Sequence, residues 1–309
     1  MQPGSSMLTY LRGAAHHGPC LAFGSNSVQH GTAVFEGIRC YDGPGGPAVF
    51  RLDDHLRRLL DSARLVGIDH PYDLVALRGE VLAAATAAGL ADAYLRPVLF
   101  TPAPVLGGDL RALPFEPATE VWPAPGAEVR PAAAARLTIS PWRRPSPSAF
   151  PVRAKATGTY VHSALARTQA GRAGFDDAIQ LDPDSGRVAE ATVANVFLVK
   201  DGQLRTPWLA DSVLAGITRD TVLQLAADLG LAADEAPVTV SELLTADEVF
   251  LTGTASEIVP VQSVDGARYP ARPVTEALIA AFRRAVAEDD THDWRTPVPG
   301  HPPTTAAVS

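Results

Sequence analysis

The first hundred residues alternate short strand-like runs with helical segments, and this alternation limits the folds open to the chain. Two runs of β-branched and aromatic residues, 31–41 and 47–52, flank the turn sequence DGPGG, which predicts a β-hairpin. Leucine, alanine and valine then recur at helical spacing over 56–66. A second helix, at roughly 72–89, ends at Gly89, and AYLRPVLFTP returns to strand character. We therefore expect an α+β first domain.

The second half of the chain is richer in strands. The runs RLTISPW, DAIQL, GRVAEAT and ADEVFLTGT have strand character, and the KDGQ turn inside NVFLVKDGQLRTP predicts another hairpin. Helices are expected at about 157–173, 216–229 and 274–288. With 309 residues, 46% of them hydrophobic, the chain is long enough for two domains and a substantial core.

A segment rich in proline, alanine and glycine, VWPAPGAEVRPAAAA, indicates a domain boundary near residue 125. We expect a small N-terminal α/β domain over 1–124, a linker over 125–131 and a larger C-terminal domain over 132–290. The remaining segment, 291–309, is rich in proline and threonine and is expected to be a loose tail.

Composition excludes several classes of function. A net charge of −8, with acidic and basic residues dispersed, argues against nucleic acid as the main partner. We find neither a membrane-spanning run nor a signal-peptide pattern, and Cys20 and Cys40 form no C-x-x-C pair, so we expect a cytoplasmic protein with small buried free cysteines. Seven histidines lack metal-ligand spacing and are interpreted as surface or capping residues: His16, His17, His55, His70, His162, His292 and His301.

The chain has 26 lysines and arginines, of which only Lys155 and Lys200 are lysines. Lys200 precedes Asp-Gly in a predicted turn and is interpreted as a solvated turn residue. Lys155 lies among small residues in AKATGTY. A lysine can release its proton and attack a carbonyl, which an arginine cannot do. The local sequence leaves open whether Lys155 is such a nucleophile or a surface lysine at a helix start.

Two segments have the character of anion sites. Gly216, Ile217 and Thr218 open a predicted helix, whose N–H groups and dipole favour phosphate, and LTGTASE offers a small hydroxyl-bearing turn. Each alone fits a capped helix or a surface turn equally well. Together with a nucleophilic lysine they suit pyridoxal phosphate, whose aldehyde forms a Schiff base with lysine.

Seven segments together resemble the class IV (fold type IV) pyridoxal-phosphate aminotransferases, and in particular the branched-chain amino-acid aminotransferases. They are HGTAVFEGIRCYDG, VFRLDDHLRRLLDSA, AYLRPVLF, AKATGTY, GRVAEATVANVFLVKDG, LAGITRD and ADEVFLTGTASEIVPV, in the family's order from about residue 29 to 265. The resemblance implies a two-domain, D-amino-acid-aminotransferase-like fold with the cofactor at the domain interface and the lysine in the C-terminal domain.

The resemblance also implies roles for the residues around the cofactor. Lys155 corresponds to the catalytic lysine that holds pyridoxal 5′-phosphate and shuttles a proton. Arg58 corresponds to the arginine that binds the phosphate, whereas Arg57 falls at a variable, surface position. Glu190 corresponds to the carboxylate that keeps the pyridine nitrogen protonated, and Tyr160 to a tyrosine beside the ring.

Three further residues correspond to phosphate contacts: Ile217, Thr218 and Thr254. The implied reaction is a ping-pong transamination, through a lysine aldimine, between leucine, isoleucine or valine and 2-oxoglutarate. The family also implies a homodimer or larger homo-oligomer, with no nucleic-acid or membrane partner.

For the substrate, the resemblance implies that Tyr94, Thr254 and Ala255 hold the α-carboxylate, and that Arg96 binds the side-chain carboxylate of glutamate. Phe35 would belong to the apolar pocket. Burial alone would also explain Phe35 and Tyr94 as core aromatics, and a structural ion pair would explain Arg96.

Three positions depart from the branched-chain pattern. His30 replaces a tyrosine of the pocket, Ala194 replaces a carboxylate, and the 122–127 segment lacks the usual aromatic residue, with Trp122 nearby but shifted. These departures bear on which amino acid is accepted. An aminotransferase for a specialised amino acid of a secondary pathway therefore stays open, as does a non-catalytic binding protein on the same scaffold.

Overall fold

The computed structural model describes residues 7–18, 20–124, 134–288 and 291–300. The chain separates into two compact units, which are described one at a time. Unit 1 comprises residues 1–130, 154–158 and 283–309, and unit 2 comprises residues 131–153 and 159–282.

This division differs from the expected one at two places, while the expected linker over 125–131 falls among residues that are not described. The segment 154–158, with Lys155, belongs to unit 1 and not to the C-terminal unit. Hydrogen bonds from Phe35 N–H to Lys155 O (3.0 Å) and from Thr157 N–H to Ala33 O (2.8 Å) attach it there. The expected loose tail contains a strand, β17 (Arg295–Pro297), beside a buried Trp294.

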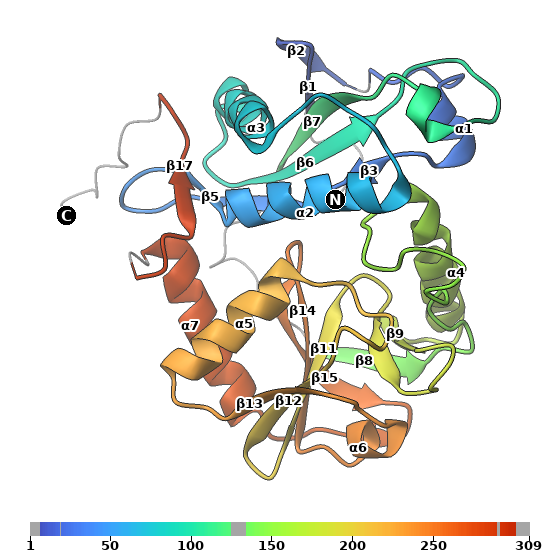
Figure 1. Cartoon of the computed structure of the whole chain (residues 1–309). Coiled ribbons are helices and arrows are strands. Elements are labelled where there is room, and N and C mark those ends of the chain that lie inside the picture. The colour runs from blue at the N-terminus through green and yellow to red at the C-terminus, as the bar shows by residue number, and fades with distance from the viewer. Residues whose placement is uncertain (1–6, 19, 125–133, 289–290, 301–309) are drawn as a thin grey trace. The chain divides into compact units, whose positions relative to one another are not determined.

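The described part of unit 1 contains an eight-stranded antiparallel sheet (Figure 1). Its order is β17, β5 (Ala48–Phe50), β4 (Ile38–Tyr41), β6 (Ala93–Phe100), β7 (Glu116–Pro123), β1 (Leu8–Leu11) and β2 (Ala14–His17), and β3 (Val34–Phe35) also pairs with β6. The predicted hairpin around DGPGG is confirmed as β4 and β5, with Cys40 opposite Val49. Cys40 is buried as expected, but Cys20 is exposed, so the expectation was wrong for Cys20.

Both predicted helices of unit 1 are confirmed as α2 (Leu52–Val66) and α3 (Leu74–Ala88). The apolar residues of α2 are buried along one face, and Asp73 caps α3 by accepting from Ala76 N–H. Gly89 ends α3 with a φ of 61°, a conformation that glycine adopts without strain. Two short helices were not predicted: α1 (Asn26–His30) and η1 (Leu110–Ala112).

The sheet of unit 1 has two different faces. On one face Thr119 donates a hydrogen bond to Glu80 of α3, and α3 therefore covers this face. Because side chains alternate along a strand, the residues that flank Thr119 in sequence point the other way. On that second face Tyr94 stands opposite Trp122, and Arg96 opposite Glu120.

Unit 2 contains a nine-stranded mixed sheet in its described part (Figure 1). Its order is β10 (Val188–Ala191), β9 (Asp177–Leu181), β8 (Ala135–Ile139), β15 (Glu257–Val264), β14 (Glu248–Gly253), β11 (Asn195–Lys200), β12 (Gln203–Pro207) and β13 (Ala233–Ala236), with β16 (Ala267–Arg268) beside β15. Phe197 and Phe250, opposite each other on β11 and β14, are fully buried and stack at 5.0 Å.

The three helices predicted for the second half are confirmed as α4 (Tyr160–Arg172), α5 (Ile217–Asp228) and α7 (Pro273–Ala287). The short α6 (Val240–Leu244) and the strand β15 were not predicted. The KDGQ turn joins β11 to β12, with positive φ at Asp201 and Gly202, as in a two-residue hairpin.

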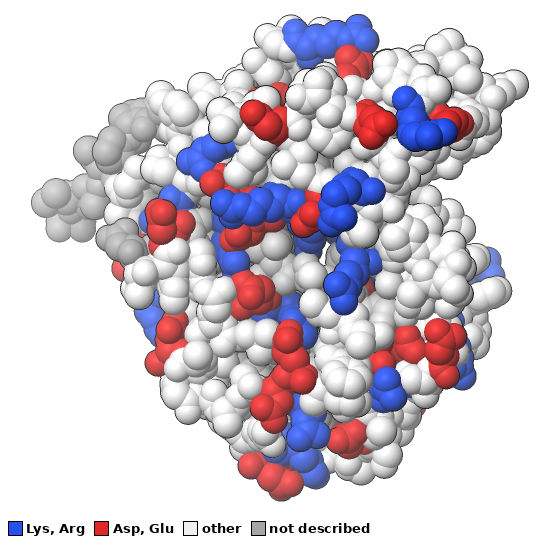
Figure 2. All heavy atoms as spheres, in the orientation of Figure 1, with Lys and Arg blue, Asp and Glu red and all other residues white. Residues whose placement is uncertain are grey.

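Acidic and basic side chains are interspersed over the face seen in Figure 2, as the composition predicted. Within the described residues, no helix is long and apolar enough to cross a membrane. The same residues hold no group of three or more histidine, cysteine, aspartate or glutamate side chains that could bind a metal ion.

Candidate active site

The backbone of Lys155 is held at both ends within unit 1. Its N–H donates to Ser62 Oγ (3.0 Å), and Ser62 Oγ donates to Arg58 O one helical turn earlier (2.7 Å). Its carbonyl accepts from Phe35 N–H. The Nζ atom lies 5.0 Å from the centroid of the Phe35 ring. The lysine therefore lies beside α2 and β3 instead of on a solvated helix start.

Arg58 projects from α2 onto a buried carboxylate. Its Nε and Nη2 donate to the two oxygens of Glu36 at 2.7 and 2.8 Å, and the Glu36 side chain is fully buried. His55 lies one turn earlier on α2, and its Nδ1 is 2.7 Å from Glu36 Oε2. Neither Glu36 nor His55 was singled out from the sequence, and the interpretation of His55 as a surface or capping residue was wrong, because its ring is buried.

The charges of this cluster follow from its burial and its contacts. Burial alone would raise the pKa of Glu36, but the charge of Arg58 and the hydrogen bonds from His55 and Arg58 outweigh it and hold that pKa well below its usual range. Burial lowers the pKa of His55 despite the pull of Glu36. His55 is therefore neutral near pH 7, and because its partner is an ionised carboxylate, Nδ1 carries the proton and donates it.

Aromatic rings surround Arg96 on the second face of the sheet. The guanidinium carbon lies 4.8 Å from the Phe35 centroid, 5.8 Å from that of Tyr94 and 5.9 Å from that of Trp122. Arg96 Nη2 also donates to the Tyr94 hydroxyl at 3.5 Å. Trp122, which the sequence placed near the pocket but shifted, thus lies beside Tyr94 and Arg96, two of the predicted substrate-binding residues.

Gly37 is required by this arrangement. A Cβ atom on Gly37 would lie 2.1 Å from the Tyr94 hydroxyl oxygen. Any larger residue would displace the tyrosine.

His30, the first departure from the branched-chain pattern, ends α1 and is exposed. Its Nε2 accepts from Gly107 N–H at 3.2 Å. Asn26, at the other end of α1, donates to the carbonyls of Val105 (2.7 Å) and Gly107 (3.0 Å). These bonds attach α1 to the 103–107 loop.

In unit 2, Glu190 on β10 is buried within a separate cluster. Arg144 Nη2 lies 3.1 Å from Glu190 Oε1, and Asn195 Nδ2 and Leu214 N–H donate to Glu190 Oε2 at 2.9 and 3.1 Å. Arg144 also donates through Nε to Ser212 O at 3.1 Å. Arg144 was not recognised from the sequence, because the partners of its side chain, Glu190 and Ser212, lie 46 and 68 residues further along the chain (190 − 144 and 212 − 144).

The predicted phosphate-binding helix start is confirmed as a helix start: Gly216 is the N-cap of α5, with no side-chain cap, and Ile217 and Thr218 form its first turn. A Cβ on Gly216 would lie 1.9 Å from Asn195 Oδ1, so the Glu190 cluster packs directly against this end of α5. Thr254 and Ala255 lie in the turn between β14 and β15, and Tyr160 begins α4.

The two basic residues interpreted as surface groups are confirmed. The Arg57 side chain is 58% exposed and pairs with Asp54. Lys200 is 45% exposed, donates to Thr245 O and lies 4.0 Å from Asp247.

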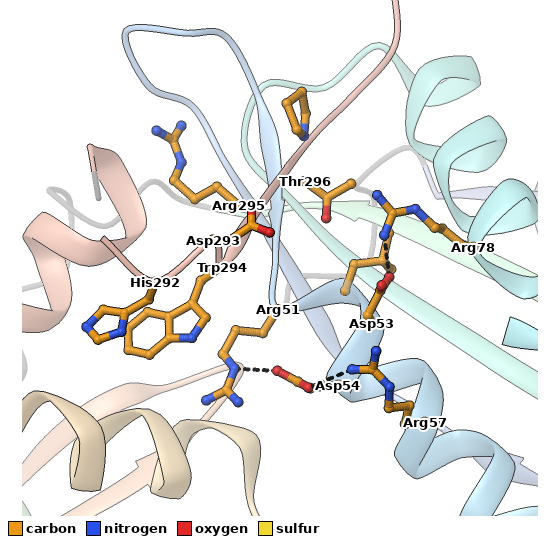
Figure 3. A pocket seen from close by; sticks show the side chains of 12 residues that line it. Arg51, Asp53, Asp54, Arg57, Arg78, His292, Asp293, Trp294, Arg295 and Thr296 are labelled. Carbon is orange, nitrogen blue, oxygen red and sulfur yellow. Dashed lines mark hydrogen bonds and ion pairs between the residues drawn. The ribbon is translucent and has the colours of Figure 1, made fainter. Parts of the chain in front are cut away.

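A pocket of about 370 Å³ in unit 1 lies where α2 begins, beside β17 (Figure 3). In the close-up, Asp54 bridges Arg51 and Arg57, while Asp53 pairs with Arg78. None of the predicted site residues lines this pocket, and three of its four arginines, Arg51, Arg57 and Arg78, pair with aspartates within it. We therefore do not assign this pocket to the cofactor.

Unit 1 therefore brings together five of the predicted residues: Phe35, Arg58, Tyr94, Arg96 and Lys155. Six others belong to unit 2: Tyr160, Glu190, Ile217, Thr218, Thr254 and Ala255.

Comparison with known proteins assigns the family. The model of the class IV amino-transferases matches residues 33–264. The branched-chain-amino-acid aminotransferase of Pseudomonas aeruginosa is 38% identical over 281 residues, covering 88% of this chain and 90% of that protein. The protein of the same name from Escherichia coli K12 is 38% identical over 271 residues, covering 84% and 85%.

Solved structures agree. A branched-chain aminotransferase of Thermoproteus uzoniensis with norvaline has a TM-score of 0.89 at 38% identity, covering 95% of this chain and 99% of that one. The branched-chain amino acid aminotransferase of Thermobaculum terrenum in its PLP form has a TM-score of 0.87 at 31% identity, covering 95% and 99%. The chain belongs to the class IV aminotransferase family, and it is an aminotransferase of fold type IV, as the sequence predicted. Members of this class use pyridoxal 5′-phosphate.

Proposed function

We propose that the protein transfers the amino group of a branched-chain L-amino acid to 2-oxoglutarate in a ping-pong reaction that depends on pyridoxal 5′-phosphate. The observation that carries this proposal is the placement of Lys155 Nζ beside Phe35, whose ring also contacts the guanidinium of Arg96. A reactive amine, an apolar ring and a carboxylate-binding cation thus adjoin one another within unit 1. The branched-chain aminotransferases that resemble this chain support the choice of substrate.

In this proposal the chain's own residues bind and orient the cofactor. Lys155 would hold it covalently through Nζ and move a proton during the reaction, and Arg58, oriented by Glu36, would bind the phosphate. Ile217 and Thr218 at the start of α5, with Thr254, supply further phosphate contacts, since a helix N-terminus favours an anion. When bound, pyridoxal phosphate supplies the aldehyde that accepts the amino group and a ring that withdraws electrons.

Glu190 and Tyr160 are proposed to act on the ring. Glu190 pairs with Arg144 and is oriented by Asn195 and Leu214 N–H, and its carboxylate is proposed to keep the pyridine nitrogen protonated. Tyr160 is proposed to donate a hydrogen bond to the ring's oxygen.

Substrate recognition is proposed for the second face of the unit 1 sheet and for the β14–β15 turn. Phe35 and Trp122 provide apolar area for an aliphatic side chain, and Arg96 binds the distal carboxylate of glutamate or 2-oxoglutarate. Tyr94, Thr254 and Ala255 are proposed to hold the α-carboxylate.

The test is a substrate panel on the purified protein with 2-oxoglutarate as acceptor, measured as glutamate formed. Leucine, isoleucine and valine are expected to dominate over aromatic, acidic, basic and D-amino acids. If the protein binds the cofactor but another amino acid dominates, the specialised aminotransferase is the correct alternative. If no amino acid reacts, the non-catalytic alternative is correct.

The two lysines allow a direct test of the catalytic residue. Borohydride reduction of the loaded protein followed by peptide mapping should find the cofactor on Lys155. We expect Lys155→Ala to abolish this labelling and to lower turnover at least about 1,000-fold. Lys200→Ala, in an exposed turn, is the matched control and should leave both unchanged.

We further propose a homodimer or a larger homo-oligomer in the cytoplasm. Five exposed apolar side chains gather where α1 is attached to the 103–107 loop: Leu21, Phe23, Val28, Val105 and Leu106. Such a patch favours contact with a second copy. Analytical ultracentrifugation should show that Phe23→Ser with Leu106→Ser lowers the mass of the assembly, whereas Val75→Ser, equally exposed on α3, does not.

A further inference from the structure

Glu36 and His55 are two buried titratable residues to which the proposed chemistry gives no role. Glu36 accepts four hydrogen bonds: two from Arg58, one from His55 Nδ1 and one from Gly37 N–H at 3.2 Å. A carboxylate with no exposed surface is costly unless its charge is compensated, and here the cation of Arg58 compensates it.

The geometry of this pair determines where the guanidinium can point. A guanidinium is a planar fork, and Glu36 occupies the edge formed by Nε and Nη2. The plane and rotation of Arg58 are therefore set by Glu36. His55 in turn sets the orientation of Glu36, because its Nδ1 donates to the oxygen that also receives Arg58 Nη2.

We propose that Glu36, fixed by His55, is the positioning residue for Arg58 and thereby determines how tightly the protein binds the phosphate group of its cofactor. This inference rests on the proposed role of Arg58 as the phosphate-binding arginine. Neither Glu36 nor His55 contacts the cofactor in this scheme, and both act through Arg58.

A second hydrogen-bonded path from the same helix provides an internal control. Arg58 O accepts from Ser62 Oγ, which accepts from Lys155 N–H, so Ser62 supports the lysine instead of the guanidinium. Changes at Glu36 should affect the phosphate end of the cofactor, and changes at Ser62 the aldehyde end.

The experiment compares two probes on the full-length protein freed of cofactor: pyridoxal 5′-phosphate and pyridoxal, which lacks the phosphate. Dissociation constants are measured by tryptophan fluorescence. For Glu36→Gln we expect the constant for pyridoxal phosphate to rise at least about tenfold and that for pyridoxal to change by less than about twofold. Ser62→Ala should raise the dissociation constants of both probes by the same factor.

A double-mutant cycle tests whether Glu36 acts through Arg58. In an Arg58→Ala background, Glu36→Gln should have no further effect on the affinity for pyridoxal phosphate. If Arg58→Ala does not itself lower the preference for the phosphorylated probe, the proposed role of Arg58 fails. If Arg58→Ala lowers it but Glu36→Gln does not, only the present inference fails.

Histidine variants keep the inference testable if Glu36→Gln does not fold. His55→Leu removes the donor and should lower the affinity for pyridoxal phosphate, but not for pyridoxal, by about threefold. His55→Asn keeps a donor near the Nδ1 position and should have wild-type affinity for both probes. Equal effects of the two substitutions, or equal weakening of both probes, would overturn the proposal.

Discussion

The two units each contain an arginine paired with a buried glutamate, and the two pairs are proposed to have opposite roles. In unit 1 the carboxylate of Glu36 is fully buried and the arginine is the residue proposed to meet the cofactor. In unit 2 the Glu190 side chain is buried and that of Arg144 is 9% exposed, and the carboxylate is the residue proposed to meet the cofactor. In each pair one charge is proposed to bind the cofactor, and the other, not assigned from the sequence, holds it in place.

The difference between the pairs follows from the ligand groups they serve. A phosphate is an anion and needs a cation, so unit 1 supports an arginine with a carboxylate. A protonated ring nitrogen is a cation and needs an anion, so unit 2 supports a carboxylate with an arginine. A buried charge without a partner would lower the free energy of unfolding by several kcal/mol. Each charge proposed to contact the cofactor is therefore paired with a residue of opposite charge. We expect the unit 1 pair to determine cofactor affinity and the unit 2 pair to determine turnover.

The largest effect that separates the two pairs is expected at Glu190. Glu190→Gln removes the negative charge that is proposed to keep the ring nitrogen protonated, so turnover should fall at least about 100-fold. The affinity for pyridoxal phosphate should change little, because the phosphate contacts remain. Steady-state kinetics and a binding titration on the same preparation measure both quantities. A parallel loss of affinity and turnover would contradict the division between the pairs.

The next effect concerns the junction between the Glu190 cluster and α5. Gly216→Ala would place a Cβ 1.9 Å from Asn195 Oδ1, so either the amide or the start of α5 must move. We expect a loss of about 2–3 kcal/mol of unfolding free energy, as for other overpacked sites. Gly79→Ala is the matched control, since nothing lies within 4 Å of that Cβ in α3, and it should be neutral or stabilising by roughly 0.5–1 kcal/mol. Urea denaturation measures both, and equal stabilities would show that the contact is not tight.

A smaller effect is expected at Arg144. Arg144→Leu keeps apolar volume but removes the cation that pairs with Glu190, which leaves the buried carboxylate without its compensating charge and should lower turnover by about tenfold. Arg187→Leu, which breaks the Arg187–Asp211 pair of the same unit, is the matched control and should leave turnover unchanged. If the two variants behave alike, Arg144 contributes only to stability.

The smallest effect tests a half-buried carboxylate whose hydrogen bond comes from a hydroxyl instead of an arginine. Burial raises the pKa of Glu80 to about 7, partly offset by the hydrogen bond from Thr119. The folded state therefore keeps a proton that the unfolded state loses above its ordinary pKa of 4.5. Stability should fall as pH rises from about 4.5 to 7 and then level off.

Glu80→Gln should remove this pH dependence. Because Glu80 is only partly buried, we expect the variant to be more stable than wild type by about 1–2 kcal/mol at pH 8 and nearly equal at pH 4.5. Urea denaturation at the two pH values measures the difference. A gap that stays constant with pH would show that the proton on Glu80 is not the cause.

Local patterns were sufficient for many elements of the fold and for the catalytic candidate. Apolar spacing predicted α2, Gly89 predicted the end of α3, the helices α4, α5 and α7 were also expected, and the DGPGG and KDGQ turns predicted their hairpins. Short helices such as α1 and α6 were not predicted, because five residues show too little periodicity to be distinguished from a loop. The lysine and its family motifs were readable because motif residues lie within a few positions of one another.

The sequence by itself therefore determined which residues could do chemistry: one lysine among small residues, one arginine on an amphipathic helix and one glutamate in a strand. Only the tertiary structure decided which charges support them. His55 looked like a surface histidine and proved to be buried against Glu36, and Arg144 gave no local signal at all. The tertiary structure also attached Lys155 to unit 1, through hydrogen bonds to Ser62 and Phe35. These residues precede it in the chain by 93 and 120 positions (155 − 62 and 155 − 35). Local periodicity records which face of a segment is buried, but the partner of a buried charge is set by how distant segments pack, and a single sequence does not carry that pairing.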